Sequence, residues 1–423
     1  MEFQDAYQNG NEAFKNKQFK DAKTYFEQAL EDKPNDIYTL NKLAMVLKEL
    51  GDFEGAKSLL ENSLEVKKED LYTNYLLGNT YLEEGNIKKA IETLKETVNK
   101  NPNDKYARNS LALAYRMNGE YNECIKTLET AIKLNPNDLY NKLSLAMVYF
   151  DDEKIDEAKK AAKEILKNDS SNVGANILLG RIEMRDGSYL SAQKYFNDVL
   201  VKEPNNSDAH YYIGRICLET SSQDEAREHF NTAVSYAEDK IPILSNLGMI
   251  YMERGELQRA EENFAMAANL GGDEFMLSNY GKLLSMMDRN EEAIAVLKKA
   301  IEQKSDSSFA HYTLAQVYHK LRDFPNAIYS LMFAIHYEPN DVYAHNTLGK
   351  MFYEVGLYEQ SISAYEQGQK YGNEDDYAKL GIAEALIALE KVEDARKILY
   401  DLRKRTKDSK ISDKCTIRLN ELK

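Results

Sequence analysis

Residues 71–104 read LYTNYLLGNTYLEEGNIKKAIETLKETVNKNPND, and this stretch is the clearest copy of a unit that fills the chain. Its fixed points recur at one spacing, and they are Leu77-Gly78, Tyr81, Ala90, Leu94 and Pro102. Moving the register by 34 residues finds the same pattern again and again. The sequence therefore predicts an array of small stacked units, in which no single globular core is needed.

Twelve such units run without a gap from Phe3 to Ser409. They begin at Phe3, Ile37, Leu71, Lys105, Leu139, Val173, Ser207, Ile241, Glu274, Ser308, Val342 and Asp376. Eleven have 34 residues, and the eighth is one residue shorter and ends at Gly271-Gly272-Asp273.

Two positions in each unit carry small residues almost without exception. The first set is Gly10, Ala44, Gly78, Ala112, Ala146, Gly180, Gly214, Gly248, Gly281, Ala315, Gly349 and Ala383. The second set is Ala22, Ala56, Ala90, Cys124, Ala158, Ala192, Ala226, Ala260, Ala293, Ala327, Ser361 and Ala395. Small side chains at a fixed phase indicate two backbones that approach closely, which bulky residues would prevent.

This pattern resembles the tetratricopeptide repeat, a helix–turn–helix unit of 34 residues. The resemblance implies an all-α solenoid of about twelve helix pairs over residues 3–409, wound into a right-handed superhelix. We divide this single solenoid into sub-blocks 3–172, 173–273 and 274–409. Residues 410–423 are predicted to form a C-terminal capping helix, because Ile411, Cys415, Leu419 and Leu422 recur at helical spacing. The first 34-residue unit lacks such a cover, so Phe3, Ala6 and Phe14 are expected to present apolar surface there.

Turn residues agree with the register. Six glycines stand where the first helix of a unit should end in a left-handed residue: Gly51, Gly85, Gly119, Gly187, Gly255 and Gly356. Four aspartates stand where the first helix of a unit should begin, as expected of N-caps: Asp36, Asp104, Asp138 and Asp341.

Bulk composition excludes some classes of function. The net charge of −15 argues against nucleic acid or an anionic membrane as the main ligand. No apolar run is long enough to cross a membrane, so direct membrane insertion is not expected. Three widely spaced cysteines indicate buried thiols in a reducing compartment, and we expect a cytoplasmic protein. A signal segment ahead of Met1 in the natural protein would instead place it in the periplasm or envelope.

No constellation of residues indicates catalysis, so the chain is predicted not to be an enzyme and to need no cofactor or metal. Motifs such as HExxH, paired CxxC, GxSxG and GxxxxGK[ST] are absent from the sequence. His311 and His345 occupy equivalent positions of neighbouring units, which puts them about 8–10 Å apart, too far to share one zinc ion.

The resemblance implies that positions 2, 5, 9, 12 and 13 of each unit line a concave groove. Position 2 forms an aromatic ladder: Tyr38, Tyr72, Tyr106, Tyr140, Phe275, Phe309, Tyr343 and Tyr377. Aromatic rings at one phase suit a binding strip. The alternative is that each ring packs on the preceding unit.

The middle units add flexible apolar and basic side chains at groove positions. The apolar ones include Met147, Phe150, Met184, Met249 and Met252, and the basic ones are Arg116, Arg181, Arg185, Arg215, Lys282 and Lys350. Methionines accommodate varied helical ligands, and guanidinium groups pair with carboxylates. Ordinary filling between helices and internal ion pairs are the competing interpretations.

These observations predict a scaffold or adaptor that binds a peptide or an amphipathic helix of a partner protein, with its main site in units four to nine. The competing class is the regulatory or substrate-targeting subunit of an enzyme on another chain. Self-association through the uncovered first 34-residue unit is a further expectation.

Overall fold

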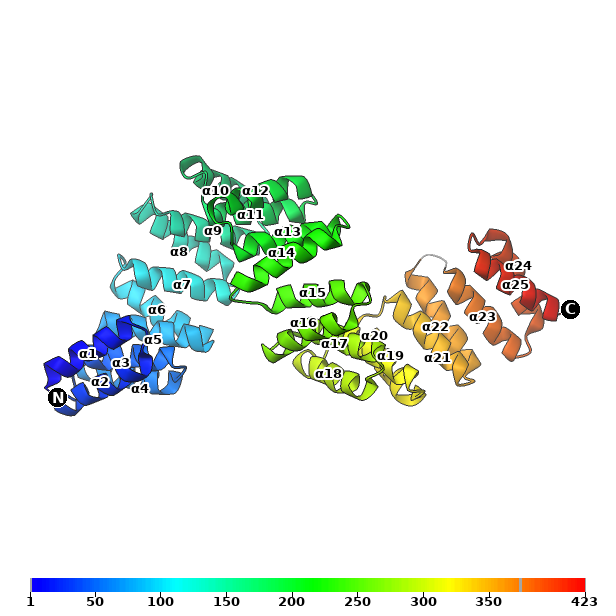
Figure 1. The fold of residues 1–423 in the computed structure, drawn as a ribbon, viewed down its shortest axis with the longest axis horizontal. Coiled ribbons are helices and arrows are strands. Elements are labelled where there is room, and N and C mark those ends of the chain that lie inside the picture. The colour runs from blue at the N-terminus through cyan, green and yellow to red at the C-terminus, as the bar shows by residue number, and fades with distance from the viewer. Residues whose placement is uncertain (1, 373–374, 423) are drawn as a thin grey trace. The chain divides into compact units, whose positions relative to one another are not determined.

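The computed structural model describes residues 2–372 and 375–422, and within these ranges the chain forms helices and no strand (Figure 1). The helices are α1 (Phe3–Lys15), α2 (Phe19–Asp32), α3 (Ile37–Glu49), α4 (Phe53–Val66), α5 (Leu71–Glu84), α6 (Ile87–Lys100), α7 (Lys105–Met117), α8 (Tyr121–Leu134), α9 (Leu139–Asp151), α10 (Ile155–Asn168), α11 (Val173–Arg185), α12 (Tyr189–Lys202), α13 (Ser207–Glu219), α14 (Gln223–Tyr236), α15 (Ile241–Glu253), α16 (Leu257–Asn269), α17 (Glu274–Met286), α18 (Asn290–Gln303), α19 (Ser308–Lys320), α20 (Phe324–Tyr337), α21 (Val342–Glu354), α22 (Tyr358–Tyr371), α23 (Asp376–Ala388), α24 (Val392–Arg405) and α25 (Ser409–Glu421).

Each odd helix from α1 to α23 begins at the residue predicted to start a unit, so the 34-residue register is confirmed. Side-chain caps explain these starts. Asp36 accepts a hydrogen bond from the backbone N–H of Thr39 at 2.9 Å, and Asp104, Asp138 and Asp341 cap α7, α9 and α21 in the same way. The four predicted N-caps are therefore confirmed.

Every odd helix from α1 to α23 is followed by one residue in the left-handed backbone region. The six predicted glycines occupy this position with φ between 71° and 87°. Six other residues adopt the same conformation with φ between 58° and 62°: Lys17, Glu153, Ser221, Asp288, Arg322 and Glu390. The turn geometry is thus common to all twelve units, and half of them tolerate a side chain where glycine is favoured.

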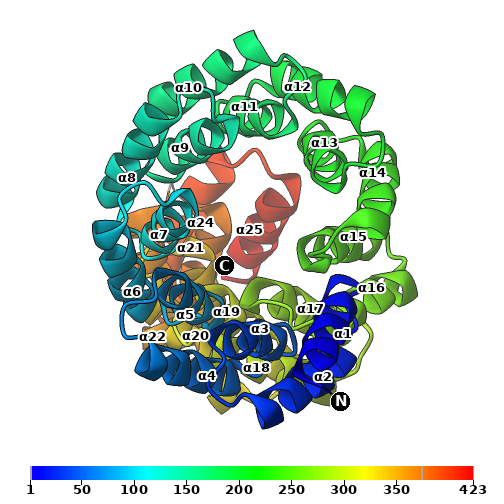
Figure 2. The same cartoon turned by 90° about the vertical axis from the view of Figure 1, so that its left-hand side faces the viewer.

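Above the level of the 34-residue units, the chain divides into two larger compact parts. We call them the N-terminal unit, Met1–Pro204, and the C-terminal unit, Asn205–Lys423. Within each of these two larger parts, an odd helix contacts the even helix that follows it, and that even helix contacts the next odd helix. In the N-terminal unit α7, α9 and α11 lie on the inner side of a curved row, and α8, α10 and α12 lie on its outer side (Figure 2). The boundary falls inside the predicted sub-block 173–273.

The core of each helix pair is a small residue of the odd helix facing a residue sixteen positions later in the even helix. Where that second residue is aromatic, the first is always glycine: Gly10 with Phe26, Gly180 with Phe196, Gly214 with Phe230, Gly248 with Phe264 and Gly349 with Tyr365. A Cβ atom added at Gly180 would lie 2.5 Å from the Phe196 ring. Four of the other pairs combine alanine with leucine, as Ala44 does with Leu60, so the two volumes are matched.

The two ends of the chain differ from each other. Helix α25 closes the C-terminal end by burying Ile411, Cys415 and Leu419, as predicted. At the N-terminal end Ala6 is fully buried, and Phe3 and Phe14 are half-buried. The ammonium group of Lys33 also lies 4.0 Å from the centre of the Phe3 ring. The expectation that Ala6 presents apolar surface is therefore wrong, because it faces its own helix pair.

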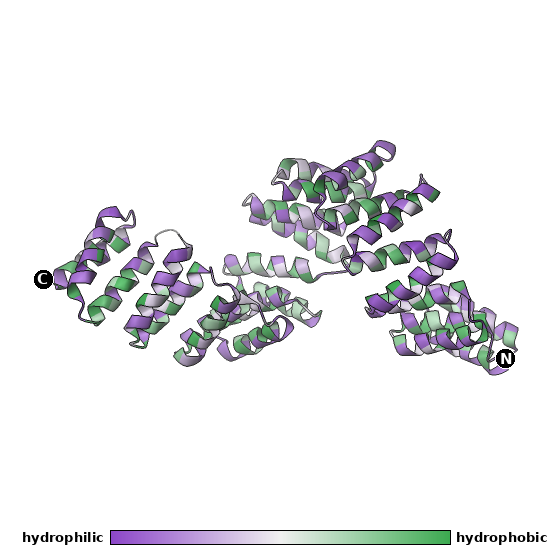
Figure 3. Ribbon diagram, turned by 180° about the vertical axis from the view of Figure 1, so that it is seen from behind, coloured by the Kyte–Doolittle hydropathy of each residue, from purple (hydrophilic) through white to green (hydrophobic). Residues whose placement is uncertain are grey.

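Apolar and polar residues alternate along the helices, as the hydropathy colouring shows (Figure 3). Among the described residues, none of the helices combines the length and the apolar character that a membrane crossing requires.

A reciprocal exchange tests the left-handed turn. Ser221 and Gly255 hold this conformation in neighbouring units, with φ of 62° and 74°, and a Cβ atom at Gly255 would meet nothing within 4 Å. Ser221→Gly is expected to raise the free energy of unfolding by up to about 1 kcal/mol, and Gly255→Ser to lower it by about 1 kcal/mol. Urea denaturation followed by circular dichroism measures both. Equal midpoints for the two variants would contradict the assignment.

A double-mutant cycle tests the matched volumes. Gly180→Ala is expected to cost about 1–3 kcal/mol of stability, because the added methyl group meets the Phe196 ring. Phe196→Leu alone costs a similar amount, because it leaves a cavity. The double variant recreates the alanine–leucine pair of other units, so its loss should be smaller than the sum by about 1 kcal/mol or more. Strict additivity in the same denaturation experiment would show that the two residues do not compete for space.

Candidate functional site

The aromatic ladder is exposed along its whole length. Its eight rings retain between 36% and 78% of their accessible surface, with Phe309 the least and Tyr343 the most exposed. Neighbouring contacts are limited: the Phe275 and Phe309 ring centres lie 5.7 Å apart, and the Tyr377 hydroxyl donates a hydrogen bond to Asp408 at 3.0 Å. Two rings also contact the preceding unit, because the Tyr72 hydroxyl lies 3.8 Å from the sulfur of Met45 and the Phe309 ring packs on Phe275, so packing on the preceding unit accounts for part of the ladder.

The predicted arginines of the N-terminal unit already have partners within the protein. The Nε atom of Arg116 lies 2.5 Å from Asp151, and Arg185 lies 3.3 Å from Glu153. The guanidinium group of Arg181 stacks over Phe150, with its central carbon 4.7 Å from the ring centre. Arg116, Arg181 and Arg185 therefore join consecutive odd helices α7, α9 and α11, and internal pairing accounts for part of their role.

The predicted apolar groove residues differ in exposure. Met147, Phe150, Met184 and Met249 are half-buried, so part of each side chain remains at the surface. Met252 is buried in its helix pair, and its prediction as a surface residue is wrong. Its neighbours Ile250 and Tyr251 on α15 are buried as well, and the equivalent residues of α5, Thr80, Tyr81 and Leu82, are also buried.

The structure divides the ten predicted middle residues between the two units. Six lie on α7, α9 and α11 of the N-terminal unit: Arg116, Met147, Phe150, Arg181, Met184 and Arg185. Four lie on α13, α15 and α17 of the C-terminal unit: Arg215, Met249, Met252 and Lys282. Arg215 and Lys282 are exposed, and the guanidinium carbon of Arg215 lies 5.9 Å from the centre of the Tyr211 ring.

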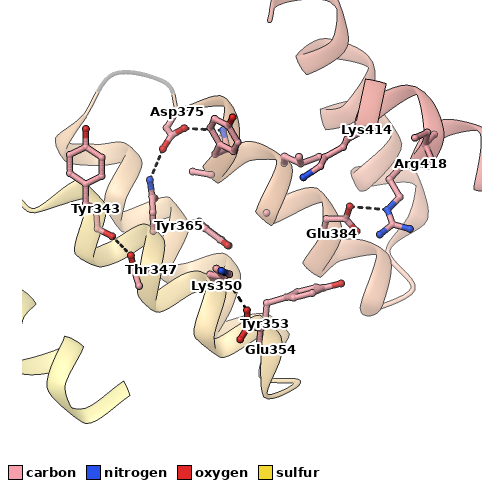
Figure 4. A pocket seen from close by; sticks show the side chains of 16 residues that line it. Tyr343, Thr347, Lys350, Tyr353, Glu354, Tyr365, Asp375, Glu384, Lys414 and Arg418 are labelled. Atoms are coloured by element: carbon pink, nitrogen blue, oxygen red, sulfur yellow. Dashed lines mark hydrogen bonds and ion pairs between the residues drawn. The ribbon is translucent and has the colours of Figure 1, made fainter. Parts of the chain in front are cut away.

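A cavity of about 970 Å³ lies in the C-terminal unit between α21, α23 and α25 (Figure 4). Its walls include the ladder residues Tyr343 and Tyr377, together with Tyr353 and Tyr365. Burial raises the pKa of Tyr365 to about 12, so this phenol stays neutral in the physiological range. Leu380, Gly381 and Ile417 add apolar surface, which suits a cavity that receives side chains.

The carboxylates around this cavity have partners within the described part of the protein, whereas one lysine does not. Glu354 contacts His319 at 2.6 Å, and Glu384 accepts a hydrogen bond from Arg418 at 2.8 Å. Asp375 accepts from the Asn346 side chain at 2.5 Å and from the backbone N–H of Tyr377 at 2.8 Å. Lys414 extends from α25 toward the cavity and has no carboxylate partner among the described residues (Figure 4). The cavity thus offers an unmatched positive charge.

Sequence reasoning named Tyr343, Lys350 and Tyr377 but missed the residues that complete the cavity. Continuing the 34-residue register from Asp376 would start a further unit at Lys410. Helix α25 begins one residue earlier, at Ser409, so Lys414 and Arg418 hold positions 6 and 10 of that helix and not groove positions 5 and 9. The 34-residue register therefore does not mark Lys414 and Arg418 as groove residues.

The described residues contain no cluster of three or more histidine, cysteine, aspartate or glutamate side chains suited to a metal ion. His210 and His229 face each other across α13 and α14, with their Nδ1 atoms 2.9 Å apart, and burial lowers the pKa of His229. Cys124, Cys217 and Cys415 are buried, and burial raises the pKa of Cys124 to about 11, which disfavours a reactive thiolate.

Comparisons with known proteins agree with this architecture. Among solved structures, the APC/C hetero-tetramer Cut9–Hcn1 matches with a TM-score of 0.52 and 14% identity, covering 91% of this chain and 96% of that one. A tetratricopeptide repeat protein from Parabacteroides merdae matches with a TM-score of 0.53 and 15% identity, covering 59% of this chain and 98% of that one. At these identities the likeness shows the fold alone. No curated protein matches the sequence.

Family models described as tetratricopeptide repeat match most of the chain. One model matches residues 13–79, 47–114 and 81–147. A second matches residues 143–192, 179–240 and 346–409, and a third matches residues 276–307. Together with the helix pairs, their shared register and their matched small positions, these matches show that the chain belongs to the tetratricopeptide repeat family.

Proposed function

We propose that this chain is a non-catalytic interaction scaffold, which binds peptide or helical segments of partner proteins along the inner faces of its odd helices. The observation that carries the proposal is the exposed ladder in the N-terminal unit. Tyr38, Tyr72, Tyr106 and Tyr140 stand at one position of four consecutive helix pairs, and all four are exposed. Tyrosine side chains give a large contact area for little loss of conformational entropy, as binding surfaces require.

The residues beside the ladder define the kind of segment that it suits. Half-buried Met147 lies on α9, the helix that carries Tyr140, and half-buried Met184 lies on the next odd helix, α11; together they supply adaptable apolar side chains. Arg181, which is held over Phe150, supplies a fixed cation at the same surface. We therefore propose a ligand with apolar anchors and acidic side chains, in agreement with the sequence-based expectation of an amphipathic helix.

The cavity of the C-terminal unit extends the same proposal to a second surface. It combines exposed Tyr343 and Tyr377 with the cation of Lys414. The nearby carboxylates already have partners, so an acidic group of a ligand would meet little repulsion from them. Two surfaces of similar chemistry on one chain suit a scaffold that holds more than one segment.

Removal of two ladder rings tests the N-terminal surface. A displayed library of random 16-residue peptides is selected on the full chain, and Kd values of the selected peptides are measured by fluorescence anisotropy. Tyr106→Ala with Tyr140→Ala should weaken binding by about 2 kcal/mol, or roughly thirtyfold in Kd, because it removes aromatic anchors. Circular dichroism should be unchanged, because both rings are exposed.

The matched control removes exposed apolar side chains from an outer helix of the same unit. Leu190 and Val201 on α12 are highly exposed, and Leu190→Ala with Val201→Ala should leave the Kd values unchanged. Equal losses in both double variants would mean that binding is nonspecific and that the ladder is not the site.

Charge reversal tests the C-terminal cavity. For selected peptides that contain aspartate or glutamate, Lys414→Glu should weaken binding about tenfold at low salt, and the difference should shrink at 0.5 M salt. Lys410→Glu is the control, because Lys410 is exposed on the same helix but does not line the cavity. If both substitutions change the affinity equally, the effect comes from the net charge of α25, and the cavity is not the binding site.

A further inference from the structure

Helix α20 differs from every other described helix because it contains no lysine, arginine, aspartate or glutamate. Its sequence is FPNAIYSLMFAIHY, in a chain of which 30% of the residues are charged. Even helices of this fold ordinarily turn a charged face to solvent, as α18 and α22 do here. The proposed function concerns the odd helices and leaves this feature unexplained.

The outer face of α20 is an exposed apolar stripe. Tyr329 is 62% exposed, Met332 56% and Tyr337 38%. His336 continues the stripe one turn beyond Met332, at the spacing of one helical face. An apolar stripe on an outer helix is the kind of surface that marks a contact with another protein.

Ring contacts beneath the stripe hold it in place. The ring centres of Tyr329 and Phe333 lie 4.8 Å apart, and the Phe333 ring stacks on buried His311 at 5.2 Å. His311 is itself fixed by a contact of its Nε2 atom with the carbonyl oxygen of Ser305 at 3.1 Å. A surface whose rings are already ordered loses little conformational entropy on binding.

The even helices on either side of α20, namely α18 and α22, carry residues of opposite charge at equivalent positions. Lys298 and Glu302 of α18 stand two repeats, or 68 residues, before Glu366 and Lys370 of α22. All four side chains are exposed. Equivalent residues of successive even helices lie at the same height along their helix axes, because α18, α20 and α22 share one register.

We propose that α20 is the contact through which two copies of this chain pair, about a two-fold axis parallel to the helix. Such an axis keeps the height along the helix and exchanges its two sides. It therefore places α18 of one copy opposite α22 of its partner. Lys298 then faces Glu366 of the second copy, and Glu302 faces Lys370 of the second copy. The two-fold axis repeats both pairs with the roles of the two copies exchanged.

Charge favours a second copy as the occupant. The chain carries a net charge of −15, so most faces of two copies repel each other on approach. The α20 stripe brings no charge against its own image, and the flanking charges attract within the screening length of about 10 Å at 0.1 M salt. One stripe is smaller than the roughly 800 Å² per partner of a stable interface, so we expect a dimer in the micromolar range.

Sedimentation equilibrium of the full chain tests the pairing over a range of concentrations. We expect wild type to move from the 48.5 kDa monomer toward twice that mass as concentration rises to about 100 µM. Tyr329→Glu places a carboxylate opposite its own image and should weaken dimerisation at least tenfold. Ser363→Glu is the control, because Ser363 is the exposed equivalent of Tyr329 on α22, and it should leave the dimer intact.

A charge exchange tests the orientation of the two copies. Lys298→Glu alone should weaken dimerisation several-fold, since it opposes Glu366 of the second copy, and Glu366→Lys alone should do the same. The two substitutions together in one chain should restore the wild-type dissociation constant. Additive weakening in the double variant would overturn the proposed axis.

Two further outcomes would overturn the proposal as a whole. One is a wild-type chain that remains monomeric up to 100 µM. The other is a dimer that persists in Tyr329→Glu, which would place self-association elsewhere, for example at α1. Neither outcome bears on the inner faces of the odd helices, because the ladder experiments measure peptide binding.

Discussion

The close approach between each odd helix and the even helix that follows is the constraint on which the rest of the molecule depends. In eleven of the twelve pairs glycine or alanine in the odd helix meets one large side chain of the even helix, and all five aromatic partners face glycine; the exception is Ala146 with Ala162. This match sets the spacing of the pair, and repetition of the spacing stacks the pairs. Because the contact is internal to each pair, the inner and outer faces are free to differ from one unit to the next.

Most of the fold could be predicted because this constraint repeats. The 34-residue register placed the start of every odd helix from α1 to α23 and four N-caps correctly. The left-handed turns at Lys17, Glu153, Ser221, Asp288, Arg322 and Glu390 could not be predicted from those residues, since only the aspartate is of a type enriched in that conformation. There the geometry of the pair imposes the turn, and the local preference of the residue is overridden.

The candidate site was less predictable because exposure depends on neighbours that a register does not describe. The eight ladder rings at position 2 are exposed, whereas Gly174 and Pro242 at position 2 of α11 and α15 are half-buried. Met252 occupies an equally regular position but is buried, as Leu82 is at the same position of α5, whereas Phe150 and Met184 at that position are half-buried. Arg116 and Arg185 meet the carboxylates of Asp151 and Glu153, and the cavity is completed by residues of α25, a helix that begins one residue before the 34-residue register would start it.

Freedom of the outer face explains why a single uncharged helix is informative. Charged outer helices keep a repeat array soluble, and their composition varies without affecting the helix pair beneath. An outer stripe of Tyr329, Met332 and His336 therefore has no structural cause in the pairing of α19 with α20, whose core is formed by Ala315 and Leu331. A dimer formed through this stripe would use an outer helix and not the inner faces of the odd helices. Each dimer would then carry two ladders, and a partner with two suitable segments would bind more tightly than either segment alone, because the second contact forms at high effective concentration.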